Sequence, residues 1–292
     1  MLEKQEKLIE FFKDRKVLIT GAAGSIGSAL AKRVAQLKPL QLILLDQDET
    51  GIFDIYEELK NKCKVDYIIC SIRDTEKIQR MFAIYKPNII YHTAAYKHVV
   101  LMEHWPDEAF KTNIEGTKNL VKAAIENKTE RFIFVSSDKA VNPKCVMGRT
   151  KKKGEEICLG ANNISTNKTK FSVVRFGNVM PSRGSVVPIF QKLIAEGKNL
   201  TVTSRKMKRY FMGIYDAANL ILQVTLMNGS IFILDMGKQI TIESLAKLMI
   251  KLSGKDLHVI YTKPSKGEKF NEKLMTKEET KVAKKVNGIY VI

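Results

Sequence analysis

Hydrophobic positions in the first 176 residues fall into short apolar runs that alternate with longer amphipathic stretches. Runs of five or six residues rich in Val, Ile, Leu and Phe are typical of buried strands. Strands are expected at 16–20, 41–46, 65–70, 88–92, 131–136 and 171–175. Between them the apolar positions recur at helical spacing. Helices are expected at 25–37, 50–61, 74–85, 106–127 and 147–161.

This alternation predicts consecutive βαβ units, and the nearly continuous apolar strands predict a sheet that is covered on both faces. The fold class is therefore α/β, a doubly wound parallel sheet. A short amphipathic helix is expected within the first 15 residues. After residue 176 the rhythm loosens. We interpret 177–292 as mainly a small C-terminal lobe, interleaved with the last strands of the sheet. Its helices are expected at 188–197, 215–227 and 241–253, with strands near 231–234 and 257–261.

The composition of the 292-residue chain, 45% hydrophobic and 27% charged, is that of a globular protein and excludes general disorder. The net charge of +18 raises the question of a nucleic-acid or anionic-membrane partner. The basic residues are, however, spread along the chain without an aromatic-interleaved stripe. We interpret them as a solvated lysine-rich surface, or as a positive field that attracts an anionic substrate, and expect no nucleic-acid partner.

The four cysteines and four histidines show neither a C-x-x-C motif nor zinc-ligand spacing, so no metal is expected. The N-terminus has no signal-peptide core. No apolar run approaches the ~18 residues of a membrane span. These features predict a cytoplasmic protein without an integral membrane segment.

The glycine run GAAGSIG at 21–27 follows the first strand and opens the first long helix. Gly21, Gly24 and Gly27 form a variant of the dinucleotide-binding fingerprint, in which a helix N-terminus receives the diphosphate. Asp46 ends the next strand, where a carboxylate binds a ribose 2′-hydroxyl. Asp48 and other acidic residues follow, and no arginine is adjacent in the sequence. The pattern predicts a Rossmann domain over 1–176 that binds NAD rather than NADP.

Three further motifs lie where the predicted strands end. They are HTAAYKHV at 92–99, VSSDKA at 135–140 and MGRTK at 147–151. Together they resemble the extended short-chain dehydrogenase/reductase family. The runs RFGNV, SRGSVVP, RYFM, LDMG and GEK, which start at positions 175, 182, 209, 234 and 267, make the resemblance narrower. It is to the UDP-N-acetylglucosamine 4,6-dehydratases of polysaccharide biosynthesis, in a sub-branch with methionine for tyrosine and here without its membrane region.

The resemblance has two departures that bear on chemistry. Met147 stands where the family usually has its catalytic tyrosine, and Ser71 stands where an aspartate usually meets adenine. The reaction implied is redox-neutral: hydride passes from sugar C4 to NAD, the C5 proton is removed, the C6 hydroxyl leaves as water and hydride returns to C6. The cofactor-binding residues implied are Gly21, Ala23, Gly24, Ser25, Ile26, Gly27, Asp46, Ser71, Ile72, Ala94, Ala95, Lys97 and Lys151.

Asp138 is the candidate acid for the departing C6 hydroxyl. Lys139 is the candidate base at C5, provided that burial or a neighbouring cation lowers its pKa. The alternative for this pair is a surface ion pair at a strand end. By resemblance, Ser137 bonds the C4 oxygen and Lys151 holds the nicotinamide ribose. Because Met147 cannot accept a proton, its better role is apolar packing against the sugar or the nicotinamide ring. The base for the C4 hydroxyl stays open between Ser137, Asp138 and a water ordered by Lys151.

The substrate implied is a UDP-sugar. Guanidinium and ammonium groups suit its diphosphate, and an amide could bond the uracil or a phosphate, although each could instead be a surface residue. The candidate substrate-binding residues are His98, Arg175, Asn178, Val187, Arg183, Arg209 and Lys269. Asn113 is expected to be structural. Glu103 and Glu155 are expected on helix surfaces or lining a pocket.

Two other functions compete with the dehydratase. A UDP-sugar 4-epimerase shares the hydride step without the elimination, and a non-catalytic protein would only bind NAD or a nucleotide sugar. The Asp138–Lys139 pair favours the dehydratase, because epimerases of this fold usually lack it and keep the tyrosine. A homo-oligomer is also expected, paired through the helices at 106–127 and 147–161.

Overall fold

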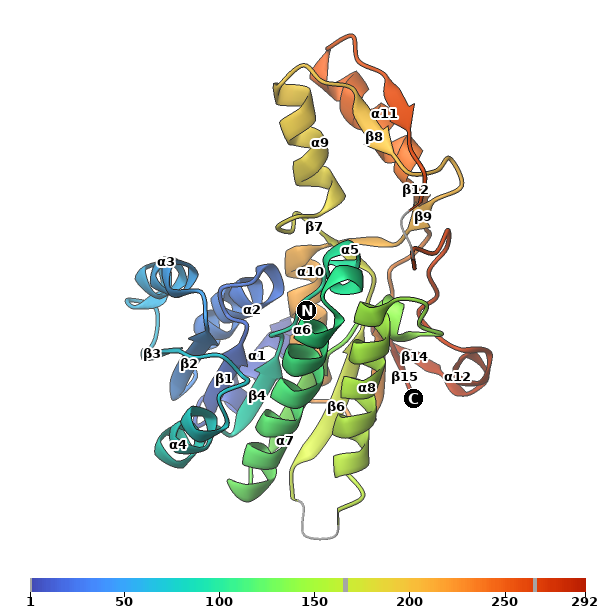
Figure 1. Cartoon of the computed structure of the whole chain (residues 1–292). Coiled ribbons are helices and arrows are strands. Elements are labelled where there is room, and N and C mark those ends of the chain that lie inside the picture. The colour runs from blue at the N-terminus through green and yellow to red at the C-terminus, as the bar shows by residue number, and fades with distance from the viewer. Residues whose placement is uncertain (1, 165–167, 265–266) are drawn as a thin grey trace.

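The computed structural model describes residues 2–164, 168–264 and 267–292. A nine-stranded sheet with the order β14-β15-β11-β6-β5-β4-β1-β2-β3 forms its centre (Figure 1). Seven of the strands run parallel, and β14 and β15 join antiparallel. The parallel strands are β1 (Lys16–Thr20), β2 (Gln41–Asp46), β3 (Val65–Ile69), β4 (Ile89–His92), β5 (Arg131–Val135), β6 (Lys170–Arg175) and β11 (Ile231–Leu234). The antiparallel strands are β14 (Lys284–Val286) and β15 (Ile289–Val291). The predicted doubly wound parallel sheet is confirmed.

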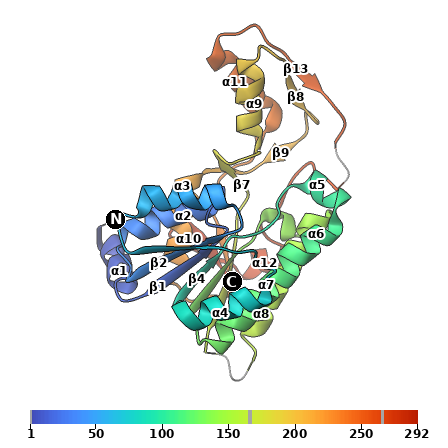
Figure 2. The ribbon, with the colours of Figure 1, turned by 60° about the vertical axis from the view of Figure 1, so that its left-hand side comes forward.

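Helices cover both faces of the sheet (Figure 2). One face carries α1 (Leu2–Phe12), α2 (Ser25–Gln36), α3 (Glu49–Leu59) and α10 (Ile214–Val224). The other carries α4 (Thr75–Tyr85), α7 (Gly116–Glu126) and α8 (Val146–Ala161). Successive residues of one strand serve the two cores, as Leu18 and Ile19 of β1 do. This explains why the strand runs are apolar throughout rather than alternating.

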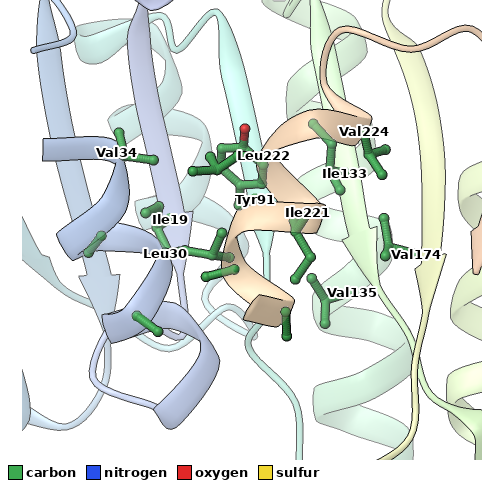
Figure 3. Packing of buried hydrophobic residues seen from close by; sticks show 14 of the residues in the cluster. Ile19, Leu30, Val34, Tyr91, Ile133, Val135, Val174, Ile221, Leu222 and Val224 are labelled. Carbon is green, nitrogen blue, oxygen red and sulfur yellow. The ribbon is translucent and has the colours of Figure 1, made fainter. Parts of the chain in front are cut away.

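The core beneath α2 and α10 combines side chains from early and late parts of the chain (Figure 3). Leu30 of α2 and Ile221 of α10 pack over Ile19 and Tyr91 of the central strands. The buried Tyr91 hydroxyl lies 2.5 Å from Oγ1 of Thr225, just beyond α10. Residues far beyond position 176 therefore complete the core of the first domain.

The region predicted as one helix at 106–127 contains three elements. They are α6 (Pro106–Phe110), a π-helical turn η1 (Lys111–Glu115) and α7, preceded by α5 (Val99–His104). Asn113 lies in the π turn, and its side chain bonds both the backbone N–H and the carbonyl of Tyr96. A π turn admits one extra residue, which aims a side chain differently from a regular helix. Asn113 is thus a structural residue, as expected.

A small lobe projects beyond the carboxyl ends of the strands (Figure 1). It contains α9 (Val186–Ala195), α11 (Ile242–Ser253), the parallel pair β8 (Leu200–Val202) and β13 (Val259–Tyr261), and the antiparallel pair β9 (Lys208–Arg209) and β12 (Ile240–Thr241). Its own core includes Phe190, Leu200, Val202 and Ala246. The chain enters it through β7 (Asn178–Met180), which pairs with β10 (Phe211–Gly213), and leaves it before α12 (Lys277–Val282).

None of the described helices has the length and apolar character needed to cross a bilayer. The outward residues of α7 and α8, the helices expected to pair two copies, are mostly charged. The exposed charged residues there are Lys118, Lys122, Glu126, Arg149, Lys153 and Glu156.

Replacing Leu30 by Ala should lower the free energy of unfolding by about 2–5 kcal/mol, because it leaves a cavity between α2 and α10. Urea denaturation would measure this loss. The matched control is Leu252→Ala, at a leucine that is 77% exposed on α11, where a change within about 0.5 kcal/mol is expected. Equal losses at both positions would contradict the packing described here.

Candidate active site

The loops that leave the carboxyl ends of the parallel strands gather the predicted site residues. β1 lies between β2 and β4, so the chain reverses its direction of travel across the sheet at the β1–β4 boundary. Ligands of such sheets bind at this switch point. The glycine loop follows β1 and Asp46 ends β2, while Ala94 to His98 follow β4 and Ser137 to Lys139 follow β5. The motifs that follow the strand ends therefore lie at one edge of the sheet.

The glycine loop packs tightly against the loop after β4. Gly21 has φ +70°, and a Cβ there would lie 2.6 Å from the backbone N of Ala94. Gly24 is the N-cap of α2, makes no side-chain capping bond and is followed by no acidic residue in the first turn. The first N–H groups of α2, at Ser25 and Ile26, are thus open to an anionic ligand at the positive end of the helix dipole.

Asp46 lies beside the glycine loop. Its Oδ2 accepts the N–H of Ala23 at 3.0 Å, and its Oδ1 accepts the N–H of Gln47 at 2.8 Å. Carboxylate oxygens have two acceptor positions each, so a ribose hydroxyl can still bind here. The surroundings differ from the sequence-based expectation in one respect. Arg183, absent from the neighbouring sequence, brings its Nη1 to 3.5 Å from Oδ2 of Asp48.

The loop around Arg183 is hydrogen-bonded both to the start of α2, beside the glycine loop, and to the loop after β4. The N–H of Arg183 donates to Ser25 Oγ at 3.0 Å, and Lys97 Nζ donates to the Arg183 carbonyl at 2.7 Å. The His98 ring meets Gly184, where a Cβ would lie 2.6 Å from its Cε1. Burial, and then the Lys97 charge, lower the pKa of His98. Predicted cofactor and substrate residues thus meet at one place.

The loop after β3 holds the residues expected to face adenine. Ser71 Oγ accepts the N–H of Arg73 at 3.4 Å, so its hydroxyl is part of a turn. Ile72 is buried against α7, where a Cβ on Gly116 would lie 2.5 Å from its Cδ1. Ala94 and Ala95 are half-buried across the edge. Open helix N–H groups, an acidic strand end and an apolar wall together fit a dinucleotide.

A tight turn after β5 holds the predicted acid–base pair. Ser137 Oγ donates to Asp138 Oδ1 at 2.9 Å, and Lys139 Nζ lies 3.1 Å from the same oxygen. The Asp138 N–H donates to the Phe176 carbonyl at 2.9 Å, which fixes the turn against β6. Asp138 is fully buried, and its Oδ2 makes no hydrogen bond. This pair is therefore not an exposed surface ion pair.

The pKa of Lys139 shifts in the opposite direction to the one that a role as base requires. Burial lowers the pKa of Lys139, but the charges of Asp138 and Glu272 outweigh burial and the repulsion from Arg209, so the net shift is upward. Lys139 is an ammonium in the ligand-free protein. A group in this state can give a proton but cannot take one.

Lys151 shows the opposite shift. Its Nζ donates to the Val135 carbonyl at 2.5 Å and lies 4.1 Å from the centre of the Phe134 ring. Burial lowers the pKa of Lys151 to about 8, despite the charge of Glu155. One turn earlier, Met147 is buried with Met102 and other apolar side chains of the protein, and its packing against a sugar or nicotinamide ring stays a prediction.

Arg175 does not occupy the substrate-binding role expected of it. It is 1% exposed, its Nε and Nη2 donate to the two oxygens of Glu155 at 2.7 Å each, and its Nη1 donates to Glu279 at 2.8 Å. Glu155, expected on a helix surface, is fully buried and also accepts from Ser136 Oγ at 2.6 Å. The guanidinium fork that suits a phosphate binds two carboxylates of the protein instead.

The other candidate substrate residues lie between the sheet and the lobe. Arg209 is buried, with its Nη1 donating to the Lys208 and Phe270 carbonyls. Lys269 Nζ donates at 2.8 Å to the carbonyl of Val141, two residues beyond Lys139. The remaining two, Asn178 at the start of β7 and Val187 in the first turn of α9, are half-buried.

Sequence reasoning missed two residues near this site. The charge of Glu272 raises the pKa of Lys139. In the sequence, only the nearby GEK motif points to the segment that carries Glu272. His92, at the end of β4, bonds Thr20 and Thr117 with its two ring nitrogens at 2.8 and 3.0 Å. Burial, with the Lys151 charge, lowers the pKa of His92 to about 3, so it is a neutral support between β1 and α7.

Comparison with known proteins shows the family of this chain. The family described as "Polysaccharide biosynthesis protein" matches residues 17–292. The chain belongs to this family. It is 45% identical over 276 residues to the "Probable polysaccharide biosynthesis protein EpsC" of Bacillus subtilis, covering 91% of this chain and 46% of that relative. The chain thus spans about half the length of that relative.

Other relatives of similar length carry enzyme names. "UDP-N-acetylglucosamine 4,6-dehydratase (inverting)" of Campylobacter jejuni is 34% identical, covering 96% of this chain and 83% of the relative. "UDP-glucose 4-epimerase" of Rickettsia canadensis is 33% identical, with the same two coverages of 96% and 83%. Among solved structures, Pen from Bacillus thuringiensis is 35% identical, with a TM-score of 0.91 over 97% of this chain and 90% of that one. The relatives with enzyme names are thus a nucleotide-sugar dehydratase and a nucleotide-sugar epimerase, and the expected family resemblance is confirmed.

Replacing Lys151 by Met should change the pH dependence of stability. The folded state holds the Lys151 proton less tightly than the unfolded state does, so the native protein gains stability relative to Lys151→Met as pH rises from about 8 to about 10. Urea unfolding of the cofactor-free protein at several pH values measures the difference. A difference that is independent of pH over this range would contradict the lowered pKa.

Replacing Arg175 by Met should destabilise the protein by about 3–5 kcal/mol, because two carboxylates lose their buried partner. The control is Arg183→Met, at an arginine whose side chain is 69% exposed, where a change within about 0.5 kcal/mol is expected. Unchanged stability of Arg175→Met, together with weaker binding of a UDP-sugar, would restore the substrate role.

Proposed function

We propose that the protein is an NAD-dependent nucleotide-sugar 4,6-dehydratase. Its proposed substrate is UDP-N-acetylglucosamine, and its proposed product is the UDP 4-keto-6-deoxy sugar. The observation that carries this proposal is the buried Asp138–Lys139 pair at the end of β5. Elimination of water across C5 and C6 needs one group that takes a proton and another that gives one. A 4-epimerase performs no chemistry at those two carbons and needs no such pair.

The dinucleotide site supports the cofactor assignment. The open N-terminus of α2 would hold the diphosphate, Asp46 a ribose hydroxyl and Lys151 the nicotinamide ribose. Bound NAD would supply the acceptor for the C4 hydride and the donor for C6. The reaction returns the hydride that it takes, so the cofactor stays in place between turnovers.

The charges of Asp138 and Lys139 favour the reverse of the roles first expected, in which Asp138 was the acid and Lys139 the base. The Asp138 carboxylate takes the C5 proton, and the Lys139 ammonium gives a proton to the departing C6 hydroxyl. Water leaves, the bound cofactor would supply the hydride at C6, and Asp138 returns its proton to C5. Lys139 then regains a proton from solvent.

The C4 hydroxyl needs a separate proton acceptor, since Met147 cannot serve. We assign Lys151, whose lowered pKa leaves part of it neutral near neutral pH and lets it release the proton it takes to solvent before the next turnover. Ser137, whose hydroxyl already donates to Asp138, would position the C4 oxygen. These roles require a bell-shaped pH profile that rises with deprotonation of Lys151 and falls with deprotonation of Lys139.

Incubating the purified protein with UDP-N-acetylglucosamine, without added cofactor, should give a nucleotide sugar lighter by one water and carrying a 4-keto group. Mass spectrometry measures the loss directly. Conversion to the galacto isomer at unchanged mass would establish the epimerase instead. No change, even with NAD added and other UDP-sugars offered, would leave a binding protein.

Replacing Lys139 by Ala should stop dehydration while the protein keeps its NAD, because the proton donor is lost and the dinucleotide site is untouched. Turnover and bound NAD are measured on the same preparation. Lys153→Ala, at an exposed lysine paired with Glu156 on α8, is the matched control and should turn over normally. Normal turnover by Lys139→Ala would remove Lys139 from the mechanism.

A further inference from the structure

Arg73 is a partly buried arginine for which the proposed chemistry has no role. It directly follows Ser71 and Ile72, the residues expected to face adenine. Its guanidinium bonds elements that come after β4. Nε donates to Thr112 Oγ1 in η1 at 2.8 Å, and Nη2 donates to Glu108 of α6, at 2.5 Å to Oε2 and at 3.1 Å to the carbonyl. Arg73 therefore fastens the loop after β3 to the helical segment that follows β4.

Tyr96, in the loop after β4, joins the same group of contacts. Cζ of Arg73 lies 5.6 Å from the centre of the Tyr96 ring, within the range of a cation–π contact. Asn113, which neighbours Thr112 in η1, accepts the Tyr96 N–H at 2.8 Å and donates to the Tyr96 carbonyl at 3.0 Å. Tyr96 directly follows Ala95, an expected cofactor residue. The contacts of Arg73 therefore reach the second loop as well.

Helix α7 completes the support of the first loop. Asn119 Nδ2 donates to the Ile72 carbonyl at 3.0 Å. The loop after β3 is thus held by α6, η1 and α7 together, and the loop after β4 is held by η1. Both loops carry expected cofactor-binding residues. The two sides of the predicted dinucleotide site therefore share one support, to which Arg73 contributes a side-chain bridge.

We propose that Arg73 is a positioning residue of the cofactor site, which fixes the loop after β3 relative to the loop after β4 so that both loops receive the adenosine end of NAD without rearrangement. The inference rests on the NAD-dependent function proposed above for the identity of the ligand. It assigns Arg73 no contact with the reacting atoms of the sugar.

The departure at Ser71 makes this positioning important. A carboxylate, which the family usually has there, would form a charge-assisted hydrogen bond, and a hydroxyl forms a weaker one. The Ser71 hydroxyl also accepts the Arg73 N–H. Affinity for the adenosine end then depends on how little ordering the loops need on binding, because ordering a loop costs free energy. The planar guanidinium of Arg73 presents its donors in a fixed fork, so one side chain sets both the distance and the orientation between the loops.

Replacing Arg73 by Met removes the donors and keeps an unbranched side chain. NAD binding to the whole chain freed of cofactor, measured by isothermal titration calorimetry, should weaken about tenfold, which corresponds to about 1.4 kcal/mol for the lost hydrogen bonds. At saturating NAD, kcat should stay within about threefold of the original value, because the residues that move protons lie after β5 and in α8. Equal affinity of the two proteins for NAD would overturn the inference.

Hydrogen–deuterium exchange of the cofactor-free protein tests the positioning directly, without ligand or turnover. Backbone amides of residues 93–98, in the loop after β4, should exchange faster in Arg73→Met than in the unsubstituted protein. The amides of β6 and β11, on the far side of the sheet from β3, should stay as protected as before. Unchanged exchange at 93–98, with the loop after β3 alone affected, contradicts a bridge between the loops and would sink the inference.

Two matched variants separate positioning from charge. Lys77→Met also removes a cation from this region, where Nζ donates to the Ile69 carbonyl at 2.6 Å. It should change NAD affinity by less than about twofold. Arg73→Lys keeps the charge and loses the fork, so it should bind NAD nearly as weakly as Arg73→Met. Full affinity in Arg73→Lys, or an equal loss in Lys77→Met, would show attraction by charge and not positioning.

A double-mutant cycle tests whether Arg73 acts through η1. Thr112→Val keeps the shape of the side chain and removes the hydroxyl that Arg73 bonds. In the protein with both Arg73→Met and Thr112→Val, NAD affinity should fall by clearly less than the product of the two single effects. Fully multiplicative effects would refute the inference, because Arg73 would then act on the cofactor without η1.

The outcomes also separate this inference from the proposed function. If the unsubstituted protein binds no NAD, the proposed function fails, and the exchange experiment still decides whether Arg73 fixes the two loops. If the protein binds NAD but dehydrates no nucleotide sugar, the dehydratase fails and the NAD affinities decide the inference. If it is an active dehydratase and Arg73→Met binds NAD normally, the inference alone fails.

Discussion

The buried bonds of Arg175 determine how the later part of the chain sits on the sheet. Glu155 of α8 is fully buried, and an ionised carboxylate without a partner there would cost several kcal/mol. Arg175 at the end of β6 supplies both hydrogen bonds to it and a further pair to Glu279 of α12. One side chain thus joins the helix that carries Lys151 to the segment that follows Glu272. The helix of Lys151 and the sheet share this anchor.

The same arrangement explains why two buried lysines shift in opposite directions. Glu155 lies near Lys151, but its two oxygens are taken by Arg175, and Lys151 bonds a neutral carbonyl and faces an aromatic ring. Desolvation therefore dominates, and the pKa of Lys151 falls to about 8. Lys139 has two carboxylates acting on it, which outweigh its desolvation. Pairs of groups whose environments drive their pKa values apart are how one fold separates acid and base roles at one pH.

Much of the fold could be predicted because its signals are local. Most of the parallel strands are nearly continuous apolar runs, and the glycine loop combines spacing with a position between strand and helix. The π turn at Lys111–Glu115 gave no such signal, since Asn113 is a polar residue in an otherwise regular amphipathic pattern. From this turn Asn113 bonds the backbone of Tyr96, a tertiary contact that the amphipathic pattern does not show. Tertiary contacts override local preference at such points.

The candidate site could be predicted only as far as strand ends place residues together. Arg175 shows the limit: its motif suits a phosphate, yet its partners stand 20 and 104 residues away and are carboxylates of the protein. Arg183 shows the opposite case. It lies 135 positions from Asp48 in the sequence, yet its guanidinium lies beside the acidic residues after β2. Those acidic residues were part of the argument for NAD. The argument for NAD therefore rests on Asp46 itself. Its carboxylate is fixed by backbone N–H groups at the end of β2, where a 2′-phosphate would meet its negative charge.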